Sequence, residues 1–152
     1  DVLKHVAERI VFKIPQTGVQ GKFCMNYLLA RAIIDGRIGV EVFTDQAVRD
    51  ANILKLAERV VMRADPSLKT DDPGGRPCRV TIRLKNGQSY SRYAEHAKGS
   101  GAVPMTDDEL KAKFNECARI ALSAAVSERA LALVEDVEKL DNVRALTDML
   151  RG

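Results

Sequence analysis

Hydrophobic and polar residues alternate with a period of two from Arg79 to Lys85, and this pattern predicts a β-strand. From Val80 to Leu84 every second residue is apolar, and Asn86-Gly87 then offers the turn residues of a hairpin before Tyr90 and Tyr93. The β-branched stretch from Val6 to Ile14, which ends at Pro15, predicts a further strand. Another strand is expected from Val60 to Arg63.

Apolar residues at helical spacing predict helices between these strands. Apolar residues recur at helical spacing from Phe23 to Ile34, so a largely buried helix is expected from Lys22 to Ile34. Asp35-Gly36 closes this helix with a residue that tolerates positive φ. Thr44 is a suitable N-cap for a short helix, and a helical stripe of apolar residues follows Asp50.

The last third of the sequence is predicted to be helical. Thr106 and Glu109 form a capping-box pattern in front of an apolar stripe, and Ser127 and Asn142 can cap two further helices. Together these elements predict an α+β fold, with an antiparallel sheet of about four strands covered by helices and followed by C-terminal helices. The glycines of Lys98 to Gly101 mark the expected linker.

Composition narrows the class of protein. The 152 residues suffice for one compact domain, and 45% hydrophobic with 30% charged residues is ordinary for a globular protein. A net charge of +3 with interleaved signs gives no strong field, so neither a nucleic acid nor a membrane is expected as a partner. Cys24, Cys78 and Cys117 form no paired motif, so we expect buried, reduced cysteines and a cytoplasmic protein.

The chain lacks the familiar catalytic and metal-binding signatures, and it holds two histidines, His5 and His96. His96 and Lys98 leave a predicted strand and enter a glycine loop, where their side chains and the backbone amides could grip a carboxylate. The alternative, which is common for loop residues, is that both side chains are simply solvated.

Two further groups of residues could bind anions. Gly18 to Phe23 precedes the predicted helix, so its amides and Lys22 could form an anion site at a helix N-terminus, or merely a flexible entry loop. The predicted outward face of the hairpin carries basic residues and a tyrosine, but a solvated or partner-covered face is favoured there over a nucleic-acid-binding one. Its members are Arg79, Arg83, Lys85, Tyr90 and Arg92.

Two long stretches carry a resemblance to a known family. Residues 15–45, PQTGVQGKFCMNYLLARAIIDGRIGVEVFTD, resemble the MmgE/PrpD pattern P-x-T-G-L-E-x-K-F-S-M-x-Y followed by an A-x-A-L-x-D-G helix. Residues 79–118, RVTIRLKNGQSYSRYAEHAKGSGAVPMTDDELKAKFNECA, resemble the same family's hairpin, its H-x-K-G loop and its P-M-T-x-x-E-L-x-x-K-F helix. Both stretches occur in the family's order, so the chain resembles the C-terminal portion of an MmgE/PrpD protein.

The resemblance implies a fold and a class of chemistry. Family members include 2-methylcitrate dehydratase, cis-aconitate decarboxylase and iminodisuccinate epimerase, which act on small polycarboxylates by proton transfer without a metal or an organic cofactor. By the family pattern, residues 1–96 would form a small α+β lid domain, and residues 97–152 would be helices returning to a large helical domain. Homodimers are common in the family, so a homodimer is expected.

The resemblance also implies that this chain alone is incomplete as an enzyme. The family's N-terminal helical domain supplies most of the catalytic groups and has no counterpart here, so no catalytic residue is assigned. The loop around Thr17 is shorter than in the decarboxylase branch, where a tyrosine faces the substrate. Lys22, His96 and Lys98 are the expected substrate contacts, and the isolated chain is expected to be inactive. The alternative is a stand-alone, non-catalytic binding or assembly module.

Overall fold

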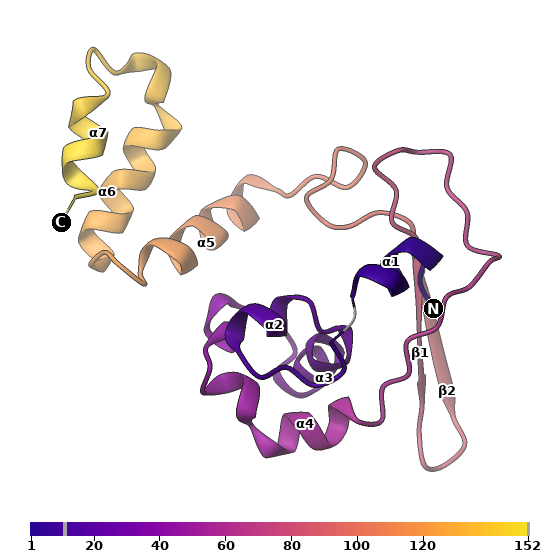
Figure 1. The fold of residues 1–152 in the computed structure, drawn as a ribbon. Helices are drawn as coiled ribbons and strands as arrows, with labels where there is room; N and C mark the ends of the chain where they lie inside the picture. The colour runs from indigo at the N-terminus through magenta and orange to yellow at the C-terminus, as the bar shows by residue number, and fades with distance from the viewer. Residues whose placement is uncertain (11, 152) are drawn as a thin grey trace. The chain divides into compact units, whose positions relative to one another are not determined.

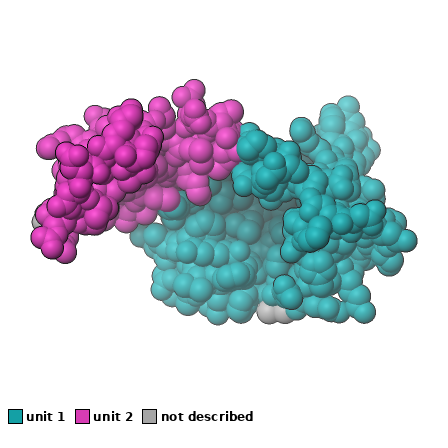
Figure 2. Space-filling view, turned by 90° about the horizontal axis from the view of Figure 1, so that it is seen from above, with its two compact units in different colours: residues 1–104 teal, residues 105–152 magenta. Residues whose placement is uncertain are grey.

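A computed structural model describes residues 1–10 and 12–151, which form two compact units, residues 1–104 and 105–152 (Figure 2). The regular secondary structure of the described residues consists of helices and one β-hairpin, which are joined by loops (Figure 1). The helical elements are α1 (Lys4–Arg9), α2 (Gly18–Lys22), α3 (Met25–Asp35), η1 (Val40–Phe43), η2 (Ala47–Arg49), α4 (Ala51–Ala57), α5 (Asp107–Ala118), α6 (Ala124–Glu135), η3 (Val137–Lys139) and α7 (Arg144–Met149). None of the helices in these ranges is long and apolar enough to cross a bilayer.

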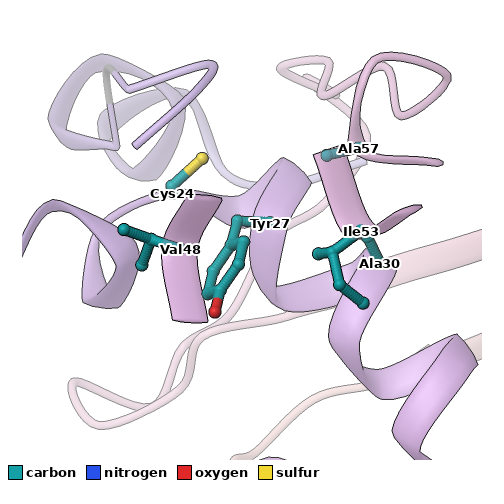
Figure 3. Packing of buried hydrophobic residues seen from close by; sticks show 6 residues of the cluster. All are labelled: Cys24, Tyr27, Ala30, Val48, Ile53 and Ala57. Carbon is teal, nitrogen blue, oxygen red and sulfur yellow. The ribbon is translucent and has the colours of Figure 1, made fainter. Parts of the chain in front are cut away.

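The core of the first unit lies between α3, η2 and α4. It consists of apolar side chains that are almost completely buried and that face one another in Figure 3, namely Cys24, Tyr27, Ala30, Val48, Ile53 and Ala57. Helix α3 ends at Gly36, whose φ of 73° is the left-handed conformation that glycine adopts without strain. Helix α4 begins where the Asp50 side chain accepts hydrogen bonds from the amides of Asn52 and Ile53.

The buried guanidinium of Arg31 forms hydrogen bonds to groups of α3 and η2 beside this core. Arg31 is 9% exposed, and its Nε donates a hydrogen bond of 3.0 Å to the Tyr27 hydroxyl, which in turn donates to the carbonyl of Val42. The other guanidinium nitrogens reach the Ala47 carbonyl at 2.8 Å and the Asp35 carboxylate at 3.2 Å. Because a buried charge must be compensated, this network fixes η1 and η2 against α3.

The sheet consists of β1 (Cys78–Arg83) and β2 (Ser89–Ala94), paired antiparallel with Val80 opposite Arg92 and Ile82 opposite Tyr90. This confirms the predicted hairpin. At its tip the amide of Gly87 bonds the carbonyl of Leu84, and Gly87 has a φ of 87°. Gly87, rather than the Asn86-Gly87 pair, thus supplies the positive φ that the turn requires.

Residues near the start of the chain touch the outer edge of β1. Val2 forms isolated bridges with Cys78 and with Ala64, antiparallel and parallel respectively. The amide of Arg79 donates to the Asp1 carbonyl at 2.9 Å, and the Asp1 amino group donates to the Arg79 carbonyl at 2.7 Å. These contacts tie the N-terminal residues to the hairpin.

The expected sheet of about four strands is not found among the described residues, which hold a two-stranded sheet plus isolated bridges. The predicted strand from Val6 to Ile14 is wrong, because Lys4–Arg9 is helical and the described residues after it pair with no strand. Residues 4–9 contain one β-branched residue, Val6, among better helix formers, and Lys4 and Glu8 form an i,i+4 ion pair of 3.9 Å. Val11 lies outside the described residues. Val60 to Arg63 also forms no strand.

The boundaries of two predicted helices are also corrected. The helix expected from Lys22 to Ile34 begins at Met25, and the preceding stretch is the separate helix α2. Ser127 does not cap a helix: it lies inside α6, is fully buried, and donates a 2.8 Å hydrogen bond to the Asn115 side chain. Ser123 caps α6, because the alanines after it extend the helix toward the N-terminus.

The second unit consists of α5, α6, η3 and α7. The capping box at Thr106 and Glu109 is present, as predicted, at the start of α5. Lys111 of α5 and Glu135 of α6 form an ion pair of 2.6 Å, and this pairing raises the pKa of the lysine. Among the described residues of this unit, only Ser127 and Ala130 are buried. The helices therefore leave much apolar surface exposed.

Removing the Tyr27 hydroxyl should destabilise the first unit. Tyr27→Phe leaves the Val42 carbonyl and the Arg31 Nε without a partner in the core, which should lower the free energy of unfolding by about 1–3 kcal/mol in urea titrations. Tyr90→Phe is the matched control, because Tyr90 is 58% exposed, and it should change little. Equal stability of the two variants would contradict the role given to the Tyr27 hydroxyl.

A side chain at Gly18 should also be destabilising. A Cβ atom there would lie 1.8 Å from the Phe43 carbonyl oxygen, so α2 could not stay against η1. Gly18→Ala should therefore lower the unfolding free energy by about 1–3 kcal/mol or more. Gly101→Ala is the control, since a Cβ at Gly101 meets no atom within 4 Å and its φ is not positive. A wild-type melting temperature for Gly18→Ala would refute this packing argument.

Candidate functional site

Lys22 lies in the last turn of α2, at the surface of the helical core. Its Nζ lies 5.8 Å from the centre of the Phe43 ring, a cation–π distance that holds the ammonium near η1 while leaving the side chain exposed. No hydrogen bond or ion pair of Lys22 is found within residues 1–10 and 12–151, so no carboxylate of these residues pairs with its charge. A carboxylate could approach it from solvent.

The predicted anion site formed by the amides of Gly18 to Phe23 is not available. This stretch is helical, and the Gly18 amide donates to the Asp45 carboxylate at 2.8 Å. The Gln20 amide donates to the Thr17 hydroxyl at 3.3 Å. The anion at this helix start is therefore Asp45 of the chain itself, and Lys22 is the charged side chain of the predicted group that stays exposed.

His96 follows β2 and is held by a neighbouring loop. Its Nδ1 lies 3.6 Å from Oδ2 of Asp72, and its side chain is 18% exposed. Asp72 is itself fixed, because its Oδ1 accepts a 2.7 Å hydrogen bond from the Gly74 amide and its carbonyl accepts one from Gly75. A histidine so placed is oriented by a carboxylate at one ring nitrogen, while its Nε2 makes no hydrogen bond within the described ranges.

Asp72 is the site residue that sequence reasoning missed. The turn-forming residues of Asp72-Pro73-Gly74-Gly75 indicate a loop, and this pattern does not mark the carboxylate as the partner of a histidine. An aspartate that accepts from the amide two residues later is the usual start of such a turn. That signal gives the turn, but the pairing with a histidine 24 positions away depends on tertiary structure.

Lys98 lies in a compact loop in which several backbone amides form hydrogen bonds within the loop. Gly99 has a φ of 88°, and its amide donates to the Val103 carbonyl at 2.7 Å. The Ser100 amide donates to the Ala97 carbonyl, and the Val103 amide returns to Ser100. The amides of Gly99, Ser100 and Val103 are therefore not available to grip a carboxylate, and Lys98 is exposed.

The three predicted contacts do not form one cluster within this chain. His96 and Lys98 share the segment after β2, whereas Lys22 lies on α2 among the core helices (Figure 1). No hydrogen bond, ion pair or ring contact joins Lys22 to His96 in the described ranges. The arrangement offers separate positive groups that could hold different carboxylates.

The hairpin's two faces differ from the prediction. Directly paired residues share a face, so Arg92 lies beside Val80, and Tyr90 lies beside Ile82, on the mainly apolar face. The polar face pairs Arg79 with Tyr93, and its Thr81 and Ser91 hydroxyls lie 3.0 Å apart. The predicted outward set of four basic residues and Tyr90 is therefore divided between two faces.

The cysteines occupy three different environments. Cys24 is fully buried, and burial raises the pKa of its thiol, although hydrogen bonds from the backbone of Tyr27 and Asn26 lower it. Cys78 is half-buried, whereas Cys117 is exposed, which corrects the expectation that all three are buried. Cys117 lines a shallow apolar groove of about 580 Å³ with α5 residues such as Phe114 and with Leu150 beyond α7. The described residues contain no cluster of three potential metal ligands.

Comparison with known proteins places this geometry in context. Residues 2–139 match the family model of the MmgE/PrpD C-terminal domain. Over 158 aligned positions the chain is 25% identical to cis-aconitate decarboxylase of Mus musculus, covering 95% of the chain and 32% of that relative. It is 22% identical to cis-aconitate decarboxylase of Homo sapiens over 155 positions, with the same coverage. The chain thus spans about a third of the length of these relatives.

Thiol labelling should separate Cys24 from Cys117. Because the thiolate reacts and Cys24 is buried with a raised pKa, a water-soluble disulfide reagent should leave Cys24 unmodified in the native protein and label it only after denaturation. Cys117 should label rapidly, and Cys117→Ser should remove the fast phase. Rapid native labelling at Cys24, located by mass spectrometry, would contradict the closed core.

Proposed function

The chain belongs to the MmgE/PrpD family, and on that basis we propose that it is the C-terminal part of an enzyme acting on small polycarboxylates. The reaction is removal of a proton next to a carboxylate, leading to dehydration, decarboxylation or epimerisation. The observation that carries the proposal is the family match over residues 2–139. The relation to two proteins named cis-aconitate decarboxylase supports a tricarboxylate-like substrate.

The role of this part is to hold the substrate's negative charges. Lys22 offers an exposed ammonium, Lys98 a second one, and His96 an imidazole whose far nitrogen can donate to a carboxylate. Proton removal next to a carboxylate builds up negative charge on that group in the transition state. Fixed positive groups at that position lower the barrier because they need no reorganisation during the reaction.

The proton-transfer groups themselves are proposed to lie outside these residues. With His5 and His96 as the chain's two histidines, no pair of titratable side chains faces a closed cavity within the described ranges. We propose that residues 1–96 form a lid over a helical domain that supplies those groups, and that residues 97–152 return to that domain. A homodimer and, since the cysteines are free thiols, a reducing cytoplasmic location are parts of the same proposal.

Turnover assays test the proposal directly. The product of the full reading frame should consume aconitate-like or methylcitrate-like acids, followed by loss of substrate and, for decarboxylation, release of carbon dioxide. The isolated chain of 152 residues should show no turnover. The proposal fails if the full product consumes none of these acids, and the division of roles fails if the isolated chain is comparably active.

Charge-removing variants of the full product test the individual contacts. Lys22→Met, His96→Asn and Lys98→Met should each lower kcat/KM about 10- to 100-fold, because a hydrogen bond to a charged group contributes about 1.5–3 kcal/mol. Lys85→Met, on the hairpin tip, is the matched control and should leave kcat/KM unchanged. A residue whose variant behaves like Lys85→Met is not a substrate contact.

A second candidate function is a stand-alone assembly module that buries its open faces on another protein. The exposed apolar groove of the second unit favours it, because groups such as Leu110 and Leu150 are 51% and 44% exposed. Genomic context separates the two candidates. A reading frame that starts near Asp1, with no helical partner upstream, would support the module, and a longer frame would support the enzyme.

A further inference from the structure

The outer edge of β1 is paired at one end and open along the rest. Asp1 and Arg79 exchange both of their backbone hydrogen bonds, at 2.7 and 2.9 Å, and Val2 faces Cys78 in antiparallel register. Val2 is 6% exposed, so this short stretch is packed as a strand is. Toward Arg83 no segment among residues 1–10 and 12–151 continues the pairing.

The register tells which backbone groups point to the open edge. In an antiparallel ladder, successive residues of one strand bond alternately to the two sides. Leu84 bonds to Gln88 across the hairpin, and Arg79 bonds outward to Asp1. Thr81 and Arg83 therefore also direct their amide and carbonyl groups outward, where no backbone partner lies in the described ranges.

One face of the hairpin is also incompletely covered. Val80 and Ile82 share it with Tyr90, and Ile82 and Tyr90 are 39% and 58% exposed. Cys78 lies on the same face next to the buried Val2. The face is thus covered where the N-terminal residues pair with β1 and exposed where that pairing stops, which indicates one missing neighbour at the open edge.

We propose that β1 receives a third strand, formed by the residues that lead directly into Asp1 in the longer protein. The proposal rests on the proposed function, in which this chain is part of a longer enzyme. Continuing the register of Asp1 and Val2, the second and fourth residues before Asp1 bond Thr81 and Arg83. The first and third lie beside Val80 and Ile82, so they are apolar, while the second and fourth are polar.

The strand would build the hairpin into a three-stranded sheet and fix it to the polypeptide that precedes it. Because the strand enters beside Arg83 and leaves at Asp1, it runs antiparallel to β1, and its apolar side chains lie beside those of Val80 and Ile82 on the exposed apolar face. The loops after β2, which carry His96 and Lys98, would then be attached to a sheet rather than to an isolated hairpin, and isolated hairpins are marginally stable in water.

Amide hydrogen exchange measured by NMR tests the proposal. In the isolated chain, the Thr81 and Arg83 amides should exchange rapidly, and the Ile82 amide more slowly. In the full reading-frame product, the Thr81 and Arg83 amides should slow by about a hundredfold or more. Ser91 and Tyr93 direct their amides to the opposite edge of the hairpin and should not gain this protection. Fast exchange at Thr81 and Arg83, or protection that appears at Ser91 and Tyr93 instead, would overturn the proposal.

A pair of proline variants provides a second test. Thr81→Pro and Ser91→Pro both remove the hydroxyl contact between these residues and one outward amide each. In the isolated chain the two variants should lower the melting temperature equally. In the full product Thr81→Pro should lower it further than Ser91→Pro does, and equal shifts there would overturn the proposal.

These readouts separate the strand from the enzymatic proposal. If the full product shows no turnover but its Thr81 and Arg83 amides exchange slowly, the strand proposal stands and the enzymatic proposal fails. An active product without that protection rejects the strand alone. A reading frame with charged residues at both the first and third positions before Asp1, or with no residues there, overturns the strand as well.

Discussion

The buried guanidinium of Arg31 is the constraint on which the first unit depends. A positive charge that is 9% exposed is tolerated because the Tyr27 hydroxyl, the Ala47 carbonyl and the Asp35 carboxylate surround it. These partners come from α3 itself and from the start of η2. The chain between α3 and α4 therefore has one arrangement in which all of these groups are satisfied, and in that arrangement Phe43 lies under the Lys22 ammonium.

The same arrangement limits which groups of the first unit can meet a ligand. The core closes tightly around Tyr27 and Cys24, and the helix start at Gly18 is already occupied by Asp45. The predicted binding residues lie at the periphery, on α2 and after β2. The outer edge of β1 and the groove of the second unit are open. Peripheral charge and open apolar surface together are what a part of a larger enzyme is expected to show.

Local signals predicted the elements that local chemistry controls. The β1–β2 hairpin follows from alternation around Asn86-Gly87, and α5 follows from the capping box at Thr106. The expected strand after Val6 failed because its β-branched residues are concentrated toward its end, while residues 4–9 favour a helix. The described residues of the second half of that stretch pair with no strand, although their β-branched composition favours one.

The candidate site was predictable in its residue types but not in its contacts. The glycine-containing loops beside Lys22, His96 and Lys98 are the sequence signal that predicts these residues as contacts. In the structure, Lys22 and Lys98 are exposed. Their surroundings depend on residues distant in sequence: Asp45 reaches Gly18 across 27 positions, and Asp72 reaches His96 across a hairpin. Such pairings are set by packing, which no local pattern encodes.

The central claim is that this segment binds the acid while other polypeptide moves its proton. A structure of the full reading-frame product with a non-reactive polycarboxylate analogue tests it most directly. The account predicts that at least one of Lys22, His96 and Lys98 contacts a carboxylate of the analogue. It also predicts that the groups nearest the acidic carbon come from outside residues 1–152. An analogue held with acid and base both from this segment, or bound without touching the segment, would contradict the account.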